Sequence, residues 1–155
     1  MGTPDKIESF KIDHDLLEPG FYISRIDGNI ITYDLRTRKP NMGAYMNNLT
    51  MHSVEHMFAT FVRSSEIRDD VVYFGPMGCQ TGFYLLVKDR TPEEVFRCTR
   101  TVIDQILAYE GEVFGASRKE CGNYKNLSLA AAKAEMRDYG KILSEWEDMT
   151  FAYKQ

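Results

Sequence analysis

The pattern of apolar and polar residues along the chain predicts two β-hairpins. Residues 21–36 form two apolar-rich runs on either side of Asp-Gly-Asn at 27–29, and these three residues accept the positive φ angles of a tight turn. Two shorter apolar runs, 71–74 and 83–87, flank a glycine-containing loop at 75–82. They predict a second hairpin.

Three helices are predicted between and after these hairpins. Apolar side chains at three- and four-residue spacing indicate a helix over about 48–66, with Asn48 or Thr50 as its N-cap. Thr91 followed by Pro-Glu-Glu is a capping box that begins a second helix. An amphipathic pattern over about 128–146 predicts the third.

The order hairpin, helix, hairpin, helix, helix predicts an α+β fold in which an antiparallel sheet is covered on one face by helices. A parallel arrangement is disfavoured, because the loop between residues 74 and 83 is too short for a crossover connection. The sequence contains no internal repeat, linker or low-complexity tract. We therefore expect residues 1–155 to form a single domain.

Charge and cysteine content narrow the classes of protein. The net charge of -4 argues against nucleic-acid binding and against an anionic membrane surface, which both require a basic patch. No apolar run approaches the about 18 residues of a membrane-spanning helix, and the first 15 residues do not resemble a signal peptide. Three cysteines without a Cys-x-x-Cys pair suit a reducing compartment, so we expect a cytoplasmic protein.

The segment His-Ser-Val-Glu-His at 52–56 is the strongest candidate for chemistry. His52 and His56 are four residues apart and would share one face of the first predicted helix, so both imidazoles could bind one metal ion. Glu55 would lie close enough to relay a proton. His-x-x-Glu-His is also the signature of one class of zinc peptidases. The alternative is a pair of solvated histidines without a metal.

The cysteines extend this candidate site. Cys121, just ahead of the last predicted helix, would complete a His2Cys set of three protein ligands, the number that catalytic metal sites commonly use. Cys79 lies in the glycine-containing loop, where backbone N–H groups can stabilise a thiolate acid/base or nucleophile. Either cysteine could instead be structural. Cys98 lies on the inward face of its helix and is interpreted as a core residue.

Together these motifs resemble the LuxS family of S-ribosylhomocysteine lyases over essentially the whole chain. The matching segments occur in the family's order, at residues 8–14, 34–36 with 40–41, 52–56, 76–82 and 121–122. The resemblance implies a LuxS/metallopeptidase-like version of the expected fold. It also implies a homodimer whose active sites lie at the subunit interface.

The resemblance further implies a metal-dependent lyase. One divalent ion per chain, iron(II) replaceable by zinc or cobalt, would be bound by His52, His56 and Cys121. The implied reaction cleaves S-ribosylhomocysteine to homocysteine and 4,5-dihydroxy-2,3-pentanedione, the precursor of the quorum-sensing signal autoinducer-2. Cys79 and Glu55 would be its general acids and bases.

Three further residues, Ser9, His14 and Arg36, match positions that family members use around the substrate. We expect Ser9 and His14 of one subunit, with Phe10 as a further candidate, to close the pocket whose metal, Glu55 and Cys79 belong to the other. Two departures from the family pattern concern the surroundings of this pocket. Tyr73 stands where relatives often have an acidic residue, and Thr37-Arg38 stands where they often have Phe-Cys.

Two other functions compete with a lyase. In a metallopeptidase or amidohydrolase, Glu55 would activate water for hydrolysis, but Cys79 would then have no role. A metal-stabilised binding module would need a closed structural site with four protein ligands, and the sequence offers three.

Overall fold

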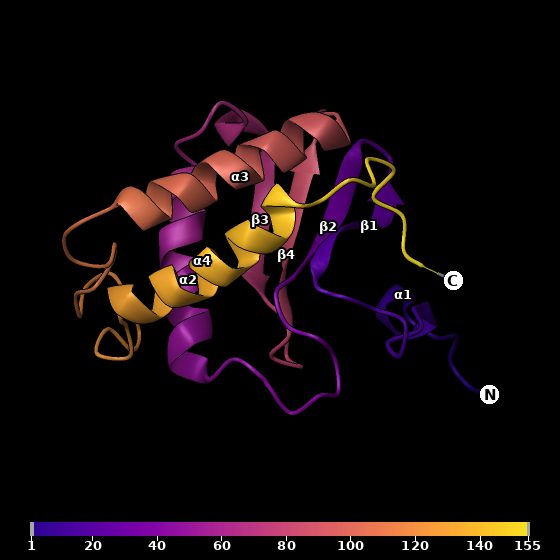
Figure 1. Cartoon of the computed structure of the whole chain (residues 1–155), viewed down its shortest axis with the longest axis horizontal. Coiled ribbons are helices and arrows are strands. Elements are labelled where there is room, and N and C mark those ends of the chain that lie inside the picture. The colour runs from indigo at the N-terminus through magenta and orange to yellow at the C-terminus, as the bar shows by residue number, and fades with distance from the viewer. Residues whose placement is uncertain (1, 155) are drawn as a thin grey trace.

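The computed structural model describes residues 2–154, which form a four-stranded antiparallel sheet with helices packed on one face (Figure 1). In chain order the elements are α1 (Glu8–Lys11), β1 (Gly20–Asp27), β2 (Ile30–Arg36), α2 (Asn48–Val62), η1 (Arg68–Asp70), β3 (Val71–Pro76), β4 (Gly82–Lys88), α3 (Pro92–Ala108) and α4 (Leu129–Ser144). The predicted α+β class is confirmed.

Both predicted hairpins form, and the sheet order is β1-β2-β4-β3. The first hairpin turns at Gly28, whose φ of 61° is in the left-handed region. The second hairpin joins the first through pairing of β2 with β4, where Gly82 lies opposite Arg36. A Cβ on Gly82 would lie 2.7 Å from the Leu35 carbonyl oxygen, so this close pairing requires glycine.

The three long helices have capped N-termini. Asn47 caps α2 by accepting a hydrogen bond from the Thr50 N–H at 2.8 Å, so the predicted caps Asn48 and Thr50 are wrong, by one and three residues. Thr91 and Ser128 cap α3 and α4 in the same way. Within residues 2–154 no helix combines the length and apolar character needed to cross a membrane.

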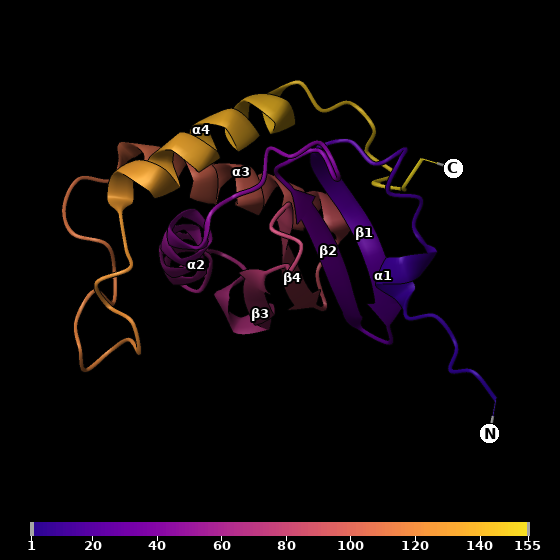
Figure 2. The same ribbon diagram turned by 90° about the horizontal axis from the view of Figure 1, so that it is seen from below.

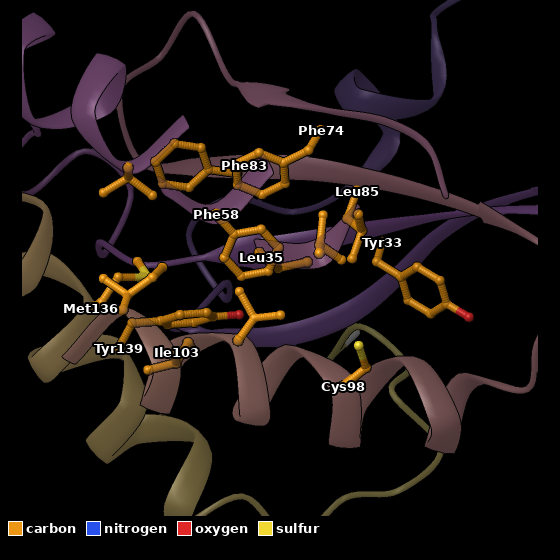
Figure 3. Close-up of a cluster of buried hydrophobic side chains, with 14 of the residues drawn as sticks. Tyr33, Leu35, Phe58, Phe74, Phe83, Leu85, Cys98, Ile103, Met136 and Tyr139 are labelled. Atoms are coloured by element: carbon orange, nitrogen blue, oxygen red, sulfur yellow. The ribbon is translucent and has the colours of Figure 1, made fainter. Parts of the chain in front are cut away.

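The hydrophobic core lies between the sheet and the helices, and Figure 2 shows α3 and α4 covering the same side of the sheet. Phe58 of α2 stacks on Phe74, and Phe74 stacks on Phe83, with ring centroids 4.3 and 5.2 Å apart. The labelled side chains of α3 and α4 approach this aromatic stack from the helical side (Figure 3). Among them is Cys98, whose side chain is buried, as predicted.

The opposite face of the sheet contains polar residues that are nevertheless buried. Along β2, Tyr33 and Leu35 belong to the core, so Asp34 and Arg36 point to the other face. Both are at most 2% exposed. They are buried because the two ends of the chain cover this face: the N-terminal segment lies against Arg36, and Tyr153 of the C-terminal tail donates a hydrogen bond to Asp34.

Candidate active site

Two histidines of α2 are held by backbone carbonyl groups. The Nδ1 atom of His52 lies 2.8 Å from the carbonyl oxygen of Asn126, and that of His56 lies 2.7 Å from the carbonyl oxygen of Phe114. A carbonyl accepts a hydrogen bond and cannot donate one, so each Nδ1 carries the proton. This tautomer leaves both Nε2 atoms free to bind a metal ion.

Cys121 completes this group. Its Sγ lies 3.4 Å from Nε2 of His52, and the ligand atoms of His52, His56 and Cys121 all lie within 4.8 Å of one another. The backbone N–H of Asn123 donates to Sγ at 3.4 Å. Two imidazoles and a thiolate suit a divalent transition metal such as zinc, iron or cobalt. The residues therefore fit a single metal ion.

Glu55 lies beside His52, His56 and Cys121, which we call the metal-type group. The residue is partly buried, and with His56 it lines an open cavity of about 600 Å³. Phe114 and Gly115 of the long loop before α4 form another wall of this cavity. A carboxylate in this position can exchange protons with a molecule bound near the histidines.

A second cavity, of about 360 Å³, lies on the opposite face of the sheet, and we call it the cysteine cleft. It is lined by residues of the N-terminal segment, the sheet and the loop between β3 and β4, namely Ser9, Phe10, His14, Arg36, Pro76, Met77, Gly78, Cys79 and Tyr84. The side chain of Cys79 is exposed to solvent. The lining contains neither Glu55 nor any residue of the metal-type group.

Arg36 gives the cysteine cleft its positive charge. Its guanidinium forms two hydrogen bonds with Asp34, at 2.6 and 3.1 Å, which fix its orientation. Its Nη1 atom donates to the Thr81 hydroxyl at 2.8 Å and lies 3.8 Å from Sγ of Cys79. The Thr81 hydroxyl is itself 3.0 Å from that sulfur. Arg36 and Thr81 thus place a positive charge and a hydroxyl group beside the Cys79 sulfur.

The family model described as S-ribosylhomocysteinase (LuxS) matches residues 7–150. The chain belongs to the LuxS family. Proteins named S-ribosylhomocysteine lyase are similar to it over nearly their full length. The protein from Finegoldia magna is 42% identical over 156 residues, covering 97% of this chain and 99% of its own.

Two other relatives with the same name agree. The protein from Borreliella burgdorferi is 40% identical over 154 residues, covering 96% of this chain and 98% of its own. The protein from Clostridium acetobutylicum is 36% identical over 157 residues, with 97% and 99% covered. The resemblance predicted from the sequence motifs is confirmed.

The site residues predicted for this LuxS-family chain fall into two groups. His52, His56 and Cys121 lie together beside Glu55, whereas Ser9, His14, Arg36 and Cys79 line the cysteine cleft. Ser9 and His14 thus reach Cys79 within one chain. No second subunit is needed to bring them to this cleft, because the N-terminal segment folds back onto the open face of its own sheet.

Several residues that contact the predicted site residues were not identified from the sequence. Asp34 and Thr81 hold Arg36, and Gly115 lies against His56. The Asp34-x-Arg36 spacing was a usable signal, because residues two apart on a strand share a face. Gly115 had no such signal, since its partner His56 is distant in the sequence.

The two departures from the family pattern lie outside the metal-type group. Arg38 donates to both carboxylate oxygens of the buried Glu135 of α4, with Nε 2.9 Å from Oε2. A buried carboxylate needs such a partner, so Arg38 has a structural role. Tyr73 is half-exposed on β3 and is not among the residues that line the cysteine cleft.

Replacing Gly115 by alanine is expected to weaken metal binding. Gly115 has a φ of 71°, and a Cβ would lie 3.1 Å from Nδ1 of His56, the atom that binds the Phe114 carbonyl. The ring would have to shift, and losing such a supporting contact costs about 10- to 100-fold in metal affinity. The left-handed backbone adds a cost of about 1 kcal/mol in folding stability. Competition with a chelator measures the affinity.

Gly122→Ala is the matched control. Gly122 is adjacent to Cys121, but a Cβ there would have no neighbour within 4 Å. This variant should keep the metal as tightly as the parent. Equal metal affinity in the Gly115→Ala and Gly122→Ala proteins would show that the His56 ring does not depend on this close contact.

Proposed function

We propose that this LuxS-family chain, acting as one domain over residues 1–155, cleaves S-ribosylhomocysteine to homocysteine and 4,5-dihydroxy-2,3-pentanedione. The observation that carries the proposal is a His2Cys group with an adjacent Glu55, in a chain that also presents Cys79 beside a buried arginine. The names of the relatives support the same substrate. The second product is the precursor of autoinducer-2.

The reaction needs proton transfers at carbon. A thioether can be eliminated when it is β to a carbonyl group, but the sugar carbonyl begins two carbons too far away. The carbonyl must therefore migrate twice, and each migration removes a proton α to a carbonyl. When bound by His52, His56 and Cys121, a divalent ion supplies a Lewis acid that polarises sugar oxygens.

The proton transfers are assigned to Cys79 and Glu55. A thiolate at Cys79, beside Arg36, takes the proton from one carbon and returns it to the next. Glu55 moves the hydroxyl protons and assists the final elimination, in which the carbon–sulfur bond breaks and homocysteine leaves as a thiol. Ser9, His14 and Arg36 line the cysteine cleft and would hold the substrate there.

The metal that we propose is iron(II), with zinc or cobalt as replacements. Iron follows from the resemblance to the family, and the two-imidazole, one-thiolate donor set is compatible with all three metals.

We also propose a cytoplasmic location. It is supported by Cys79, Cys98 and Cys121, which are all free thiols.

We further propose a homodimer in which the cysteine cleft of one chain faces the metal-type group of its partner. The proposal is supported by the lining of the cleft, which includes Cys79 but neither Glu55 nor a metal ligand. Chemistry that uses both Cys79 and Glu55 then needs two chains. Phe10, which lines the cleft, is 67% exposed and offers an apolar contact for a partner.

Mixing two inactive variants is expected to restore activity if the site is shared. A dimer of one Cys79→Ala chain and one Glu55→Gln chain keeps one site in which both groups are intact. With equal amounts and free exchange, half the dimers are mixed, so roughly a quarter of the parental activity should return. Homocysteine release before and after exchange measures it.

The control is a mixture of Cys79→Ala and His14→Ala. These residues line the same cleft of one chain, so in a mixed dimer one cleft lacks Cys79, the other lacks His14, and neither is intact. We therefore expect this mixture to show no more activity than the average of its two parents. Recovery beyond that average would mean that His14 and Cys79 of one site come from different chains. A Cys79→Ala and Glu55→Gln mixture that stays inactive would contradict the shared site.

The function itself is tested by assaying anaerobically purified protein for homocysteine release from S-ribosylhomocysteine. A substrate whose sugar carbonyl has been reduced to an alcohol is the matched control, because it has no carbonyl to migrate. We expect homocysteine from the first compound and none from the second. Release of homocysteine from both, or peptide hydrolysis that survives Cys79→Ala, would favour a hydrolase.

A further inference from the structure

The carboxylate of Asp34 has two partners on the face of the sheet that carries the cysteine cleft. Asp34 is fully buried, and Arg36 of the same strand supplies two hydrogen bonds to it. The other partner is the phenol of Tyr153, which donates to Oδ2 of Asp34 at 2.7 Å. A residue near the end of the chain therefore helps to satisfy a buried charge in the sheet.

A continuous series of contacts leads from this phenol to Cys79. Tyr153 donates to Asp34, Asp34 accepts from Arg36, and Arg36 donates from Nη1 to Thr81 at 2.8 Å. Arg36 Nη1 and the Thr81 hydroxyl lie 3.8 and 3.0 Å from the sulfur of Cys79. Asp34, Arg36 and Thr81 are all buried, so solvent does not compete for these bonds.

We propose that Tyr153 is a positioning residue for the reaction: its hydroxyl fixes Asp34 and thereby aims the Arg36 guanidinium at Cys79. The inference rests on the role of Cys79 in the proposed function. The C-terminal tail lines neither the cysteine cleft nor the metal-type group. It would nevertheless help to stabilise a thiolate at Cys79, through Asp34 and Arg36.

The state of the phenol agrees with a donor role. Burial and the neighbouring Asp34 carboxylate raise the pKa of Tyr153, so the hydroxyl keeps its proton. Burial alone would lower the pKa of Arg36, but Asp34 more than offsets this and the guanidinium stays charged. By donating to Asp34, the Tyr153 hydroxyl offsets part of the negative charge of this carboxylate. Without the hydroxyl, the charge of Asp34 would be less neutralised near the cysteine cleft.

The tail is anchored independently of this hydroxyl. Phe151 is fully buried against Phe21 and Phe96, and its carbonyl accepts a hydrogen bond from the backbone of Ile23 at 2.8 Å. The ring of Tyr153 stacks on Tyr22, with centroids 4.9 Å apart. A Tyr153→Phe protein keeps all of these contacts and loses only the hydrogen bonding of the phenol, to Asp34 and to Ser24.

The charged and titratable groups that face Cys79 set the sign of the effect. Arg36 comes from β2, His14 from the N-terminal segment and Tyr84 from β4. Of these, Arg36 carries the positive charge that Tyr153 helps to aim. Without the Tyr153 hydroxyl, Arg36 is held less firmly and Asp34 is less neutralised. Both changes disfavour a thiolate at Cys79.

The test is the rate at which iodoacetamide alkylates Cys79, followed by mass spectrometry over a range of pH in the full-length, metal-loaded protein. Since the thiolate is the reactive form, Tyr153→Phe should lower the rate at pH 7 by about threefold or more and move the pH profile upward. No substrate is needed, so the result is separate from that of the homocysteine assay.

Tyr22→Phe is the matched control. It also removes a phenol from the aromatic stack, but the Tyr22 hydroxyl donates to the carbonyl of Glu18 and not to Asp34. This variant should alkylate like the parent. Cys98 reports on folding, because burial protects it and raises the pKa of its thiol. It should stay unlabelled in both variants.

Two results would overturn the proposal. One is a Tyr153→Phe profile that superimposes on that of the parent or of Tyr22→Phe. The other is rapid labelling of Cys98 in the Tyr153→Phe protein, which would mean that the hydroxyl supports the fold as a whole and not the orientation of Arg36.

Discussion

Replacing Cys79 by alanine is expected to lower turnover of S-ribosylhomocysteine by about 100-fold or more without loss of metal, as for a general acid/base. Glu55→Gln should have an effect of similar size. Neither residue belongs to the group of His52, His56 and Cys121, so both variants should bind the metal normally. Steady-state homocysteine release, together with elemental analysis of the same samples, separates chemistry from metal binding.

Cys98→Ala provides the control for removal of a thiol. Cys98 is buried in the core on α3 and lies outside both candidate cavities, so its loss should affect stability more than turnover. Near-normal homocysteine release by Cys79→Ala would remove Cys79 from the mechanism. If Cys79→Ala or Glu55→Gln lost both homocysteine release and the metal, the replaced residue would instead have a role in binding the ion.

Replacing a predicted metal ligand should have the second large effect. Cys121→Ala and His56→Ala each leave two of three protein ligands, and we expect metal affinity to fall by more than about 100-fold. Elemental analysis after dialysis measures the remaining ion, expected at one per chain in the parent. Iron should also be lost in air more readily than zinc, which has no redox chemistry.

His14→Ala is the control for loss of an imidazole. The chain has three histidines, and His14 lies in the cysteine cleft, away from the other two. Its replacement should leave the metal content unchanged. Full metal retention by both Cys121→Ala and His56→Ala would reject the assigned ligand set.

Local sequence patterns predicted the elements well but not how they assemble. The hairpin turn at Gly28 and the capping box at Thr91 depend on neighbouring residues, and both were recognisable. The pairing of β2 with β4 was not, because two hairpins can join in several orders with the same local patterns. The short helix α1 also lacked a signal, since four residues contain little periodicity.

The same difference between local and long-range information applies to the candidate site. His52 and His56 were identified because residues four apart on a helix share one face, so the spacing alone predicts that their side chains lie together. Their supporting carbonyls could not be found, because any residue can supply a carbonyl oxygen. Tyr153 was missed for a related reason: it lies 119 residues from Asp34, and only the fold brings the two together.

The alternation along β2 has a consequence for folding fidelity. Tyr33 and Leu35 face the helices, whereas Asp34 and Arg36 face the cysteine cleft. A slip of one residue in the pairing of β2 would exchange the two sets. It would drive a carboxylate and a guanidinium into the aromatic core, at a cost of several kcal/mol per ion. The charged residues on the cleft side of β2 thereby also penalise misaligned sheets while the protein folds.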